Sequence, residues 1–140
     1  MFDFKALFDL SDRTALVVGS GSGIGRSSAM GLAQFGAHVI CADVDAEAAK
    51  ASASEITQTD GSAESIHLDM CDQQSILSGL DHIGRVHILV STPGINVRKP
   101  ILDITDEEFD RVINLNLKGT FRLVREVARN MVANGGGSVI

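Results

Sequence analysis

Short apolar runs alternate with longer amphipathic segments along the 140 residues of this chain. The apolar runs end at a glycine, an aspartate or a proline-containing loop, as buried parallel strands do. Between the runs, apolar residues recur at the three- and four-residue spacing of a helix face. This alternation predicts strands at residues 14–18, 37–42, 64–68, 86–90 and 138–140, and helices at 23–35, 46–58, 72–83 and 105–133.

Capping residues support the predicted helix boundaries. Asp72 precedes one helix and Gly84 follows it, and these residue types are preferred at the two helix ends. Thr105, with Glu108 three residues later, has the sequence signature of a capping box. Because strands and helices alternate, we expect an α/β fold of the Rossmann type, a doubly wound parallel sheet with helices on both faces.

Composition narrows the range of functions. The 12 Lys and Arg against 18 Asp and Glu give a net charge of −6, which argues against a nucleic-acid-binding face. No apolar run approaches the roughly 18 residues that span a membrane. Two cysteines and four histidines on separate elements fit neither a disulfide framework nor a metal site, so we expect a cytoplasmic protein without a metal. The chain has no tyrosine, so none of its residues supplies a phenol to a reaction.

A glycine-rich turn joins the first predicted strand to the first predicted helix. Its glycines are Gly19, Gly23 and Gly25, spaced as GxxxGxG, and Ser22 and Ile24 lie among them. Glycine lets the backbone turn tightly and approach a pyrophosphate, while the helix N-terminus offers free N–H groups and a positive dipole end. We expect a dinucleotide-binding turn, and a turn that serves packing alone is the alternative.

Asp43 follows the second predicted strand. An acid at this place can accept hydrogen bonds from both ribose hydroxyls of the adenosine half of a dinucleotide. It would repel a 2′-phosphate, and its neighbours Val44 and Asp45 supply no positive charge, nor does Ser22. The sequence therefore favours NAD over NADP. Capping of the next helix is a second role open to Asp43.

Residues 138–140 have the pattern of only the beginning of a fifth strand. A domain boundary inside a buried strand is unusual. We therefore expect residues 1–140 to be a dinucleotide-binding domain that is incomplete at its C-terminal end, the front half of a larger doubly wound domain.

These motifs resemble those of the short-chain dehydrogenases/reductases. The turn Gly19–Gly25 is similar to the family's TGxxxGIG, with valine in place of threonine before it. The segment His67–Met70 resembles the stretch in which an aspartate contacts the adenine, which assigns that role to Asp69 and a flanking contact to Met70. Asn114–Gly119 is similar to the family's N-x-N-x-x-G stretch on a long helix.

By this resemblance Asn116 is the catalytic asparagine, which perturbs its helix and helps to hold a water for a proton relay. The alternative is a polar residue that bonds within its own helix. In place of the family's NNAG the chain has Ser91-Thr-Pro-Gly94. Gly94 keeps room for the backbone beside the cofactor, and we expect Ser91 to make some of the hydrogen bonds of the family's asparagine.

The resemblance implies an NAD(P)-dependent oxidoreductase, with NAD preferred, that transfers a hydride between NAD(H) and a secondary alcohol or ketone. In the family, a serine and a YxxxK pair perform the acid–base chemistry after the start of the fifth strand. Residues 1–140 do not reach them, so we expect the chain alone to be inactive. The resemblance also implies a homo-oligomer, a tetramer or dimer. A non-catalytic NAD-binding module or truncated half-domain is the alternative.

Two basic regions add expectations about the substrate and the surface. The loop sequence GINVRKP is similar to that of gluconate and other sugar-acid dehydrogenases. This resemblance implies that the substrate is a sugar or a sugar acid. Arg98 and Lys99 in this loop either line a site for an acidic substrate or are solvated. The arginines of the long helix recur on one face, which we expect to be exposed: Arg122, Arg125 and Arg129.

Overall fold

A five-stranded parallel sheet lies at the centre of the molecule. The computed structural model describes residues 5–140, and its strands follow the order β3-β2-β1-β4-β5. Every neighbouring pair is parallel. The strands are β1 (Thr14–Val18), β2 (His38–Asp43), β3 (Ser62–His67), β4 (Ile88–Ser91) and β5 (Ser138–Val139). This is the order of a doubly wound Rossmann sheet, so the predicted fold class is confirmed.

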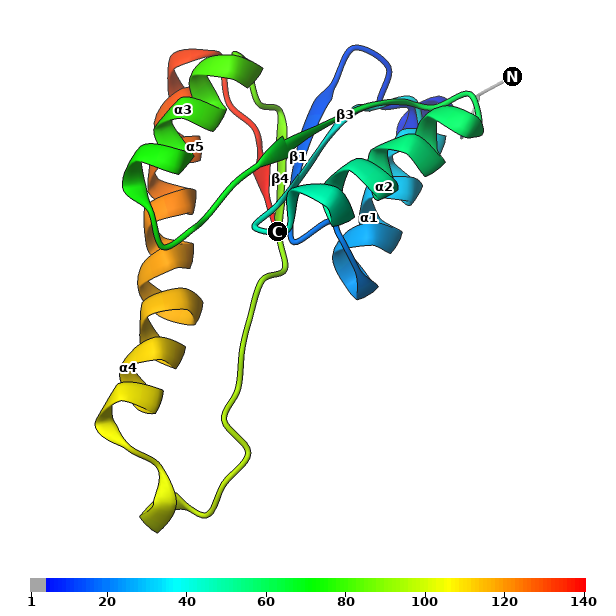
Figure 1. Ribbon diagram of the computed structural model, residues 1–140. Helices are drawn as coiled ribbons and strands as arrows, with labels where there is room; N and C mark the ends of the chain where they lie inside the picture. Colours follow the sequence, from blue (N-terminus) through cyan, green and yellow to red (C-terminus); the bar gives the residue numbers. More distant parts are fainter. Residues whose placement is uncertain (1–4) are drawn as a thin grey trace.

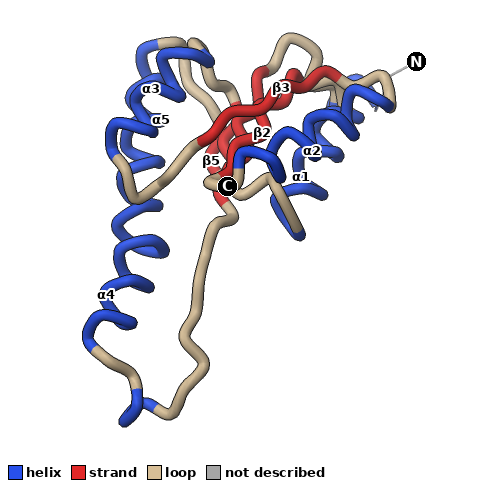
Figure 2. The backbone as a smooth tube through the Cα atoms, viewed as in Figure 1, coloured by secondary structure: helices blue, strands red, loops and turns tan. Residues whose placement is uncertain are grey.

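Helices cover both faces of the sheet (Figures 1 and 2). Two of them pack on one face and are labelled α1 (Gly23–Gln34) and α2 (Ala46–Gln58). The opposite face is covered by α3 (Gln73–Ile83) and α5 (Thr120–Ala133). The remaining elements are the short 3₁₀ helices η1 (Lys5–Phe8) and η2 (Ile101–Asp103), the helix α4 (Asp106–Ile113) and the π-helical segment η3 (Asn114–Gly119).

Strand alternation divides the core into two clusters, one on each face of the sheet. Leu16 and Val18 of β1 join the cluster that contains Leu123 of α5. Ala15 and Val17, which point the other way, join the cluster that contains Ala29 of α1. Because both faces are covered, residues 15–18 are all buried, as expected for the central strand of a parallel sheet.

Four of the five strands differ in extent from the prediction. The second runs from His38 to Asp43, one residue later than expected, and the fifth ends at Val139, one residue earlier. The third begins at Ser62, which pairs with His38, so residues 62–63 belong to the strand and not to the preceding turn. The fourth begins at Ile88 and ends at Ser91, one residue later than expected. Val86 lies outside the strand because its backbone amide donates to the Asn130 side chain at 3.0 Å.

The long C-terminal helix is not one regular α-helix. The capping box of Thr105 and Glu108 opens α4 as predicted, but residues 114–119 form a π-helical segment, so the prediction of an unbroken α-helix is wrong there. Gly119 at the end of this segment approaches Met70 so closely that a Cβ on Gly119 would lie 3.2 Å from the Cβ of Met70. A π-segment adds one residue to a turn and is frequent at functional sites.

A long connection and α4 project away from the sheet together (Figure 1). We refer to residues 95–113 as the arm. Within the part of the chain that is described, no helix has the length and apolar character needed to cross a membrane.

Candidate functional site

A cavity of about 550 Å³ opens at the carboxyl ends of the strands. It is lined from β1 on one side and from the loop after β4 on the other, which is where the strand order reverses and where doubly wound sheets bind ligands. Its size lies within the range of about 300–1,000 Å³ that is usual for ligand pockets. Nine residues predicted for cofactor binding line it: Gly19, Ser22, Gly23, Ile24, Gly25, Asp43, Asp69, Met70 and Gly94.

The three glycines of the turn have different structural requirements. Gly19 has a φ of +83°, which a side chain would strain. Gly25 packs so closely on the turn that a Cβ there would lie 2.0 Å from the carbonyl oxygen of Gly19. Gly23 has a φ of +51° and open space where its Cβ would be. Gly19 and Gly25 therefore build the turn, and Gly23 leaves backbone exposed to the cavity.

Helix α1 begins without the side-chain cap that α2, α3 and α4 have. The N-cap residue Ser22 makes no side-chain hydrogen bond to the helix, and the amides of Gly23, Ile24 and Gly25 have no hydrogen-bond partner among the described residues. By contrast, α2, α3 and α4 are capped by Asp45, Asp72 and Thr105. Uncapped amides at the positive end of a helix dipole form an anion-binding position.

Asp43 lies at the cavity edge and is held by two backbone amides. Its Oδ2 accepts from Gly21 at 2.8 Å, and its Oδ1 accepts from Asp45 at 3.0 Å. Each carboxylate oxygen keeps a further lone pair for a ligand. The N-cap of α2 is Asp45, which accepts from the amides of Glu47 and Ala48, so the alternative role of Asp43 as that cap is wrong.

Gly21 is a functional glycine that the sequence spacing did not single out. A Cβ on Gly21 would lie 2.8 Å from Oδ2 of Asp43 and 2.6 Å from the Cβ of Ala48. The turn must therefore be bare at this position for its amide to reach the carboxylate. The signal in the sequence was the unbroken Gly-x-Gly-x-Gly-x-Gly alternation of residues 19–25.

The loop after β4 contributes Thr92 where the sequence pointed to Ser91. Ser91 is the last residue of β4 and does not line the cavity, whereas Thr92, Pro93 and Gly94 do. The Thr92 hydroxyl lies 3.1 Å from the carbonyl oxygen of Val18. Since β4 ends one residue later than predicted, the first loop side chain is Thr92.

Asn116 does not line the cavity but is bonded to a residue that does. Its amide oxygen accepts from the backbone N–H of Ile95 at 2.9 Å, and its amide nitrogen donates to the carbonyl of Ile95 at 2.8 Å. The side chain thus ties the arm to the π-helical segment, and the alternative of a bond within its own helix is wrong. Ile95 lines the cavity.

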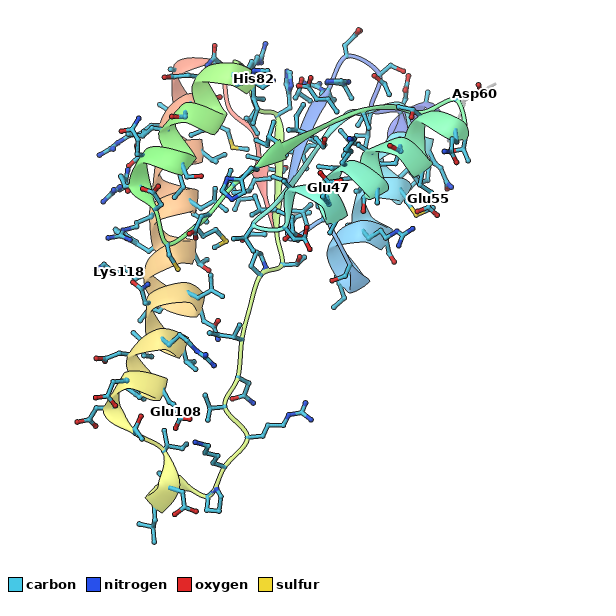
Figure 3. All side chains as sticks on the ribbon, viewed as in Figure 1. Glu47, Glu55, Asp60, His82, Glu108 and Lys118 are labelled. Atoms are coloured by element: carbon cyan, nitrogen blue, oxygen red, sulfur yellow. The ribbon has the colours of Figure 1, made fainter. Side chains whose placement is uncertain are left out.

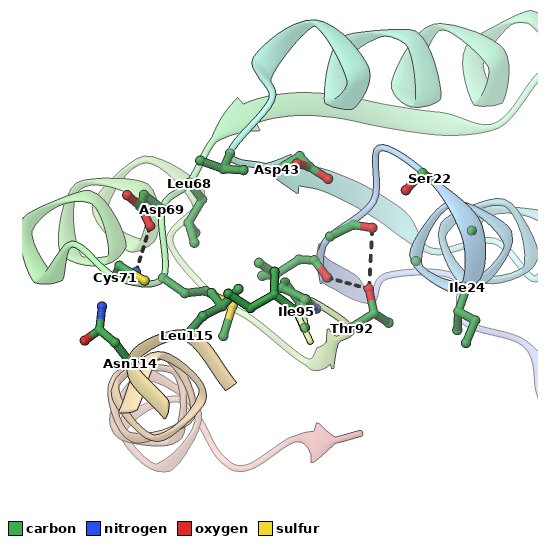
Figure 4. A pocket seen from close by; sticks show the side chains of 18 of the residues that line it. Ser22, Ile24, Asp43, Leu68, Asp69, Cys71, Thr92, Ile95, Asn114 and Leu115 are labelled. Atoms are coloured by element: carbon green, nitrogen blue, oxygen red, sulfur yellow. Dashed lines mark hydrogen bonds between the residues drawn. The ribbon is translucent and has the colours of Figure 1, made fainter. Parts of the chain in front are cut away.

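Asp69 and Met70 also line the cavity, and Asp69 lies at the end away from Ser22 and Ile24 (Figure 4). One oxygen of Asp69 accepts from the Cys71 amide at 2.8 Å, and the Asp69 amide donates to the hydroxyl of Ser75 at 3.0 Å. Burial raises the pKa of the Cys71 thiol, and the Asp69 carboxylate raises it further, so this thiol stays protonated. Further lining residues come from α4 and the start of the π-helical segment and were not predicted as site residues: Arg111, Asn114 and Leu115.

A search of known protein families finds one whose model covers nearly all of the described chain. The model of the family called short chain dehydrogenase matches residues 13–140. The chain belongs to this family.

Curated and solved members of the short chain dehydrogenase family extend this match. Sorbitol dehydrogenase from Cereibacter sphaeroides is 41% identical over 136 residues, which are 94% of this chain and 52% of that protein. A short-chain type dehydrogenase/reductase from Mycobacterium marinum superposes with a TM-score of 0.94 at 34% identity, over 99% of this chain and 58% of that one. A 7α-hydroxysteroid dehydrogenase in complex with NADH and 7-oxoglycochenodeoxycholic acid superposes with a TM-score of 0.90 at 34% identity, over 99% and 55%. The chain therefore spans about half the length of the relatives it matches.

The residues that line the cavity of this chain fit a nicotinamide dinucleotide. The open space at Gly23 lies beside the uncapped amides of α1, where a pyrophosphate needs close approach to backbone. Within residues 5–140, no three histidine, cysteine, aspartate or glutamate side chains gather as ligands of a metal would.

Several charged residues outside the cavity form ion pairs or hydrogen bonds that the sequence did not predict. Lys99 forms an ion pair with Glu108, which ties the extended part of the arm to α4. Glu108 lies in the part of the arm that projects away from the sheet (Figure 3). Glu126 is only 7% exposed and accepts hydrogen bonds from Arg125 and Arg129, both at 2.8 Å at their shortest, which hold its pKa below the usual value. Arg122 donates to the Cys71 carbonyl at 2.9 Å. The prediction of a simply exposed arginine face is therefore wrong for Arg122 and Arg125.

Proposed function

We propose that this chain forms the NAD-binding part of an oxidoreductase that transfers a hydride between NAD(H) and a secondary alcohol or ketone. The observation that supports this most directly is the single cavity edge shared by the uncapped N-terminus of α1 and the Asp43 carboxylate. A positive helix end suits the pyrophosphate, and a carboxylate beside it suits the ribose.

The bound nicotinamide supplies the hydride acceptor or donor. In this proposal the amides of Gly23, Ile24 and Gly25 donate to the pyrophosphate, and Asp43 accepts from the ribose hydroxyls. Asp69 and Met70 bind the adenine. Asn116 is the proposed catalytic asparagine, and two hydrogen bonds hold its side chain against Ile95. Gly94 lines the cavity beside the nicotinamide, and Ser91, outside the cavity, ends β4 just before this loop.

The choice of NAD over NADP rests on charge. A 2′-phosphate bound at the ribose would lie against the Asp43 carboxylate, and like charges in contact repel strongly in a partly desolvated site. The residue after Asp43 is Val44, whose side chain is 64% exposed and carries no charge to offset that repulsion.

The substrate and assembly complete the proposal. Similarity to a sorbitol dehydrogenase favours a polyol, sugar or sugar acid. We propose that a serine, a tyrosine and a lysine beyond residue 140 carry out the acid–base chemistry, because residues 1–140 contain no tyrosine.

Large exposed apolar side chains along the long helix support a homo-oligomer: Phe109, Leu117 and Phe121. The two free cysteines suit a reducing, cytoplasmic setting.

The test compares Asp43→Asn with Asp45→Asn in the natural full-length protein. The first change removes the carboxylate from the cavity edge, and the second removes an equal charge nearby while keeping a good N-cap for α2. We expect the natural protein to bind NADH more tightly than NADPH by fluorescence titration. Asp43→Asn should weaken NADH roughly tenfold or more, as expected for loss of hydrogen bonds to a charged group, and should strengthen NADPH.

Asp45→Asn should leave the ratio of the two dissociation constants unchanged. A natural protein that prefers NADPH, or an Asp43→Asn variant with an unaltered ratio, contradicts the NAD assignment. Tight NADH binding without reduction of NAD by sorbitol, other polyols or secondary alcohols would instead identify a non-catalytic NAD-binding module.

A further inference from the structure

Thr92 connects the loop after β4 to the glycine-rich turn after β1. Its backbone amide donates to the carbonyl of Val18 at 3.1 Å. Its hydroxyl lies 3.1 Å from the same carbonyl oxygen and 3.4 Å from that of Gly19 (Figure 4). One side chain thus contacts both peptide groups at which the chain leaves the strand and enters the turn.

The same hydroxyl fills the space that two glycines leave. A Cβ on Gly19 would lie 2.5 Å from Oγ1 of Thr92, and a Cβ on Gly25 would lie 2.7 Å from it. Pro93 packs on the same spot, since its Cδ would lie 3.1 Å from the Cβ of an alanine at position 19. The bare backbone at these two glycines is therefore matched to the Thr92 side chain.

The opposite flank of the turn is fixed by separate hydroxyl groups. Ser20, fully buried, donates to the carbonyl of Ala42 at 3.2 Å, and Ser52 of α2 donates to the carbonyl of Ser20 at 2.8 Å. These bonds hold the turn toward β2. Thr92 holds it toward β4, on the side where the cavity opens.

We propose that Thr92 is a positioning residue for dinucleotide binding, which sets the orientation of the glycine-rich turn through its hydroxyl. The inference rests on the proposed function and adds a determinant of affinity to it. The Gly19 peptide is in the left-handed region, and its orientation decides where the following amides of Gly23–Gly25 point. Without the hydroxyl, the Gly19 carbonyl loses its contact with the loop after β4, and the Val18 carbonyl keeps only the Thr92 amide. The free turn then samples orientations that a pyrophosphate must reverse.

The experiment removes the hydroxyl at constant shape. Thr92→Val replaces it with a methyl group, and Thr92→Ser keeps it, both in the natural full-length protein. Thr57→Val makes the same chemical change on an exposed turn of α2, where the Thr57 hydroxyl donates to the carbonyl of Ser54. The probes are NADH and ADP-ribose, which contain the pyrophosphate, and adenosine, which does not, with thermal unfolding of each variant measured in parallel.

We expect Thr92→Val to weaken NADH and ADP-ribose by roughly tenfold, the equivalent of about one hydrogen bond. Adenosine should bind as it does to the natural protein, and Thr92→Ser and Thr57→Val should bind all three probes within about twofold of it. Should Thr92→Val fail to fold, Thr92→Ala provides the same comparison with Thr92→Ser.

Three other outcomes overturn the inference. Unchanged NADH and ADP-ribose affinities in Thr92→Val, at any melting temperature, leave Thr92 with a purely structural role and leave the proposed function intact. An equal loss for adenosine indicates general damage to the cavity rather than positioning of the turn. If the natural protein binds neither NADH nor NADPH, the proposed function itself fails and the inference fails with it.

Discussion

Replacement of Gly25 by alanine tests the packing of the glycine-rich turn directly. The new Cβ would lie 2.0 Å from the Gly19 carbonyl oxygen and 2.7 Å from the Thr92 hydroxyl. The first contact is with backbone, so relief requires the start of α1 to move away from the turn. Overpacking of a buried site costs about 1–3 kcal/mol, and alanine recovers less than about 1 kcal/mol by restricting the unfolded chain. The expected net loss in the free energy of unfolding is about 1–2 kcal/mol.

Gly31 provides the matched control on the same helix. A Cβ on Gly31 meets no atom within 4 Å and its backbone is helical, so Gly31→Ala should stabilise the protein by up to about 1 kcal/mol. Urea unfolding of the natural full-length protein and both variants, followed by circular dichroism, gives the two differences. Equal or greater stability of Gly25→Ala would refute the argument that the turn and the helix are in contact through this glycine. Affinity for NADH should fall in Gly25→Ala alone.

Two further predictions concern Glu126 and Asn116. Arg129 and Arg125 lower the pKa of Glu126 below 4.5, so its ionised form contributes stability at neutral pH that is lost as the pH falls through the lowered folded value. Glu126→Gln should therefore destabilise the protein at pH 7, and its deficit in urea unfolding should shrink as the pH falls below 4.5. A deficit that stays constant with pH would contradict the ion pairs. Asn116→Ala should speed amide exchange at Ile95 and along the arm by about tenfold, since two hydrogen bonds are lost. Asn116→Asp keeps only the acceptor, so its exchange rate at Ile95 should lie between those of the natural protein and Asn116→Ala. An unchanged exchange rate in Asn116→Ala would contradict the role of these two hydrogen bonds.

Local sequence signals were sufficient to predict most of the helices and strands. Helix boundaries follow the capping residues Asp72, Gly84 and Thr105, as the chemistry of these residues predicts. A cap acts over only three or four neighbouring positions, so it can be recognised from the local sequence. The structure differs from the prediction where a hydrogen bond to a residue far along the chain determines the end of an element. Val86 is apolar and β-branched, yet it leaves the strand because Asn130, far along the chain, takes its amide.

The candidate site was predictable in its motifs but not in its supporting contacts. Glycine spacing and the acid after β2 identified residues that the structure brings to one cavity. Thr92 was missed because its partner Gly19 lies 73 positions away, and a one-residue error in the end of β4 directed attention to Ser91. The bond of Asn116 to Ile95 spans 21 positions and depends on the path of the arm, which no local pattern specifies.

The central place of β1 in the sheet has a consequence for how the site is assembled in time. The contact of its end with β2 closes a span of 22 residues, as between Ser20 and Ala42, whereas the contact with the β4 loop closes 73, as between Gly19 and Thr92. Closing the longer loop costs about 1 kcal/mol more in chain entropy, so the side of the turn toward β2 is favoured to form first. The cavity exists only after the second closure. A newly made chain therefore cannot hold a dinucleotide until β4 has docked against β1. Binding of a dinucleotide would then show that both closures are complete, which the presence of the glycine motif alone does not show.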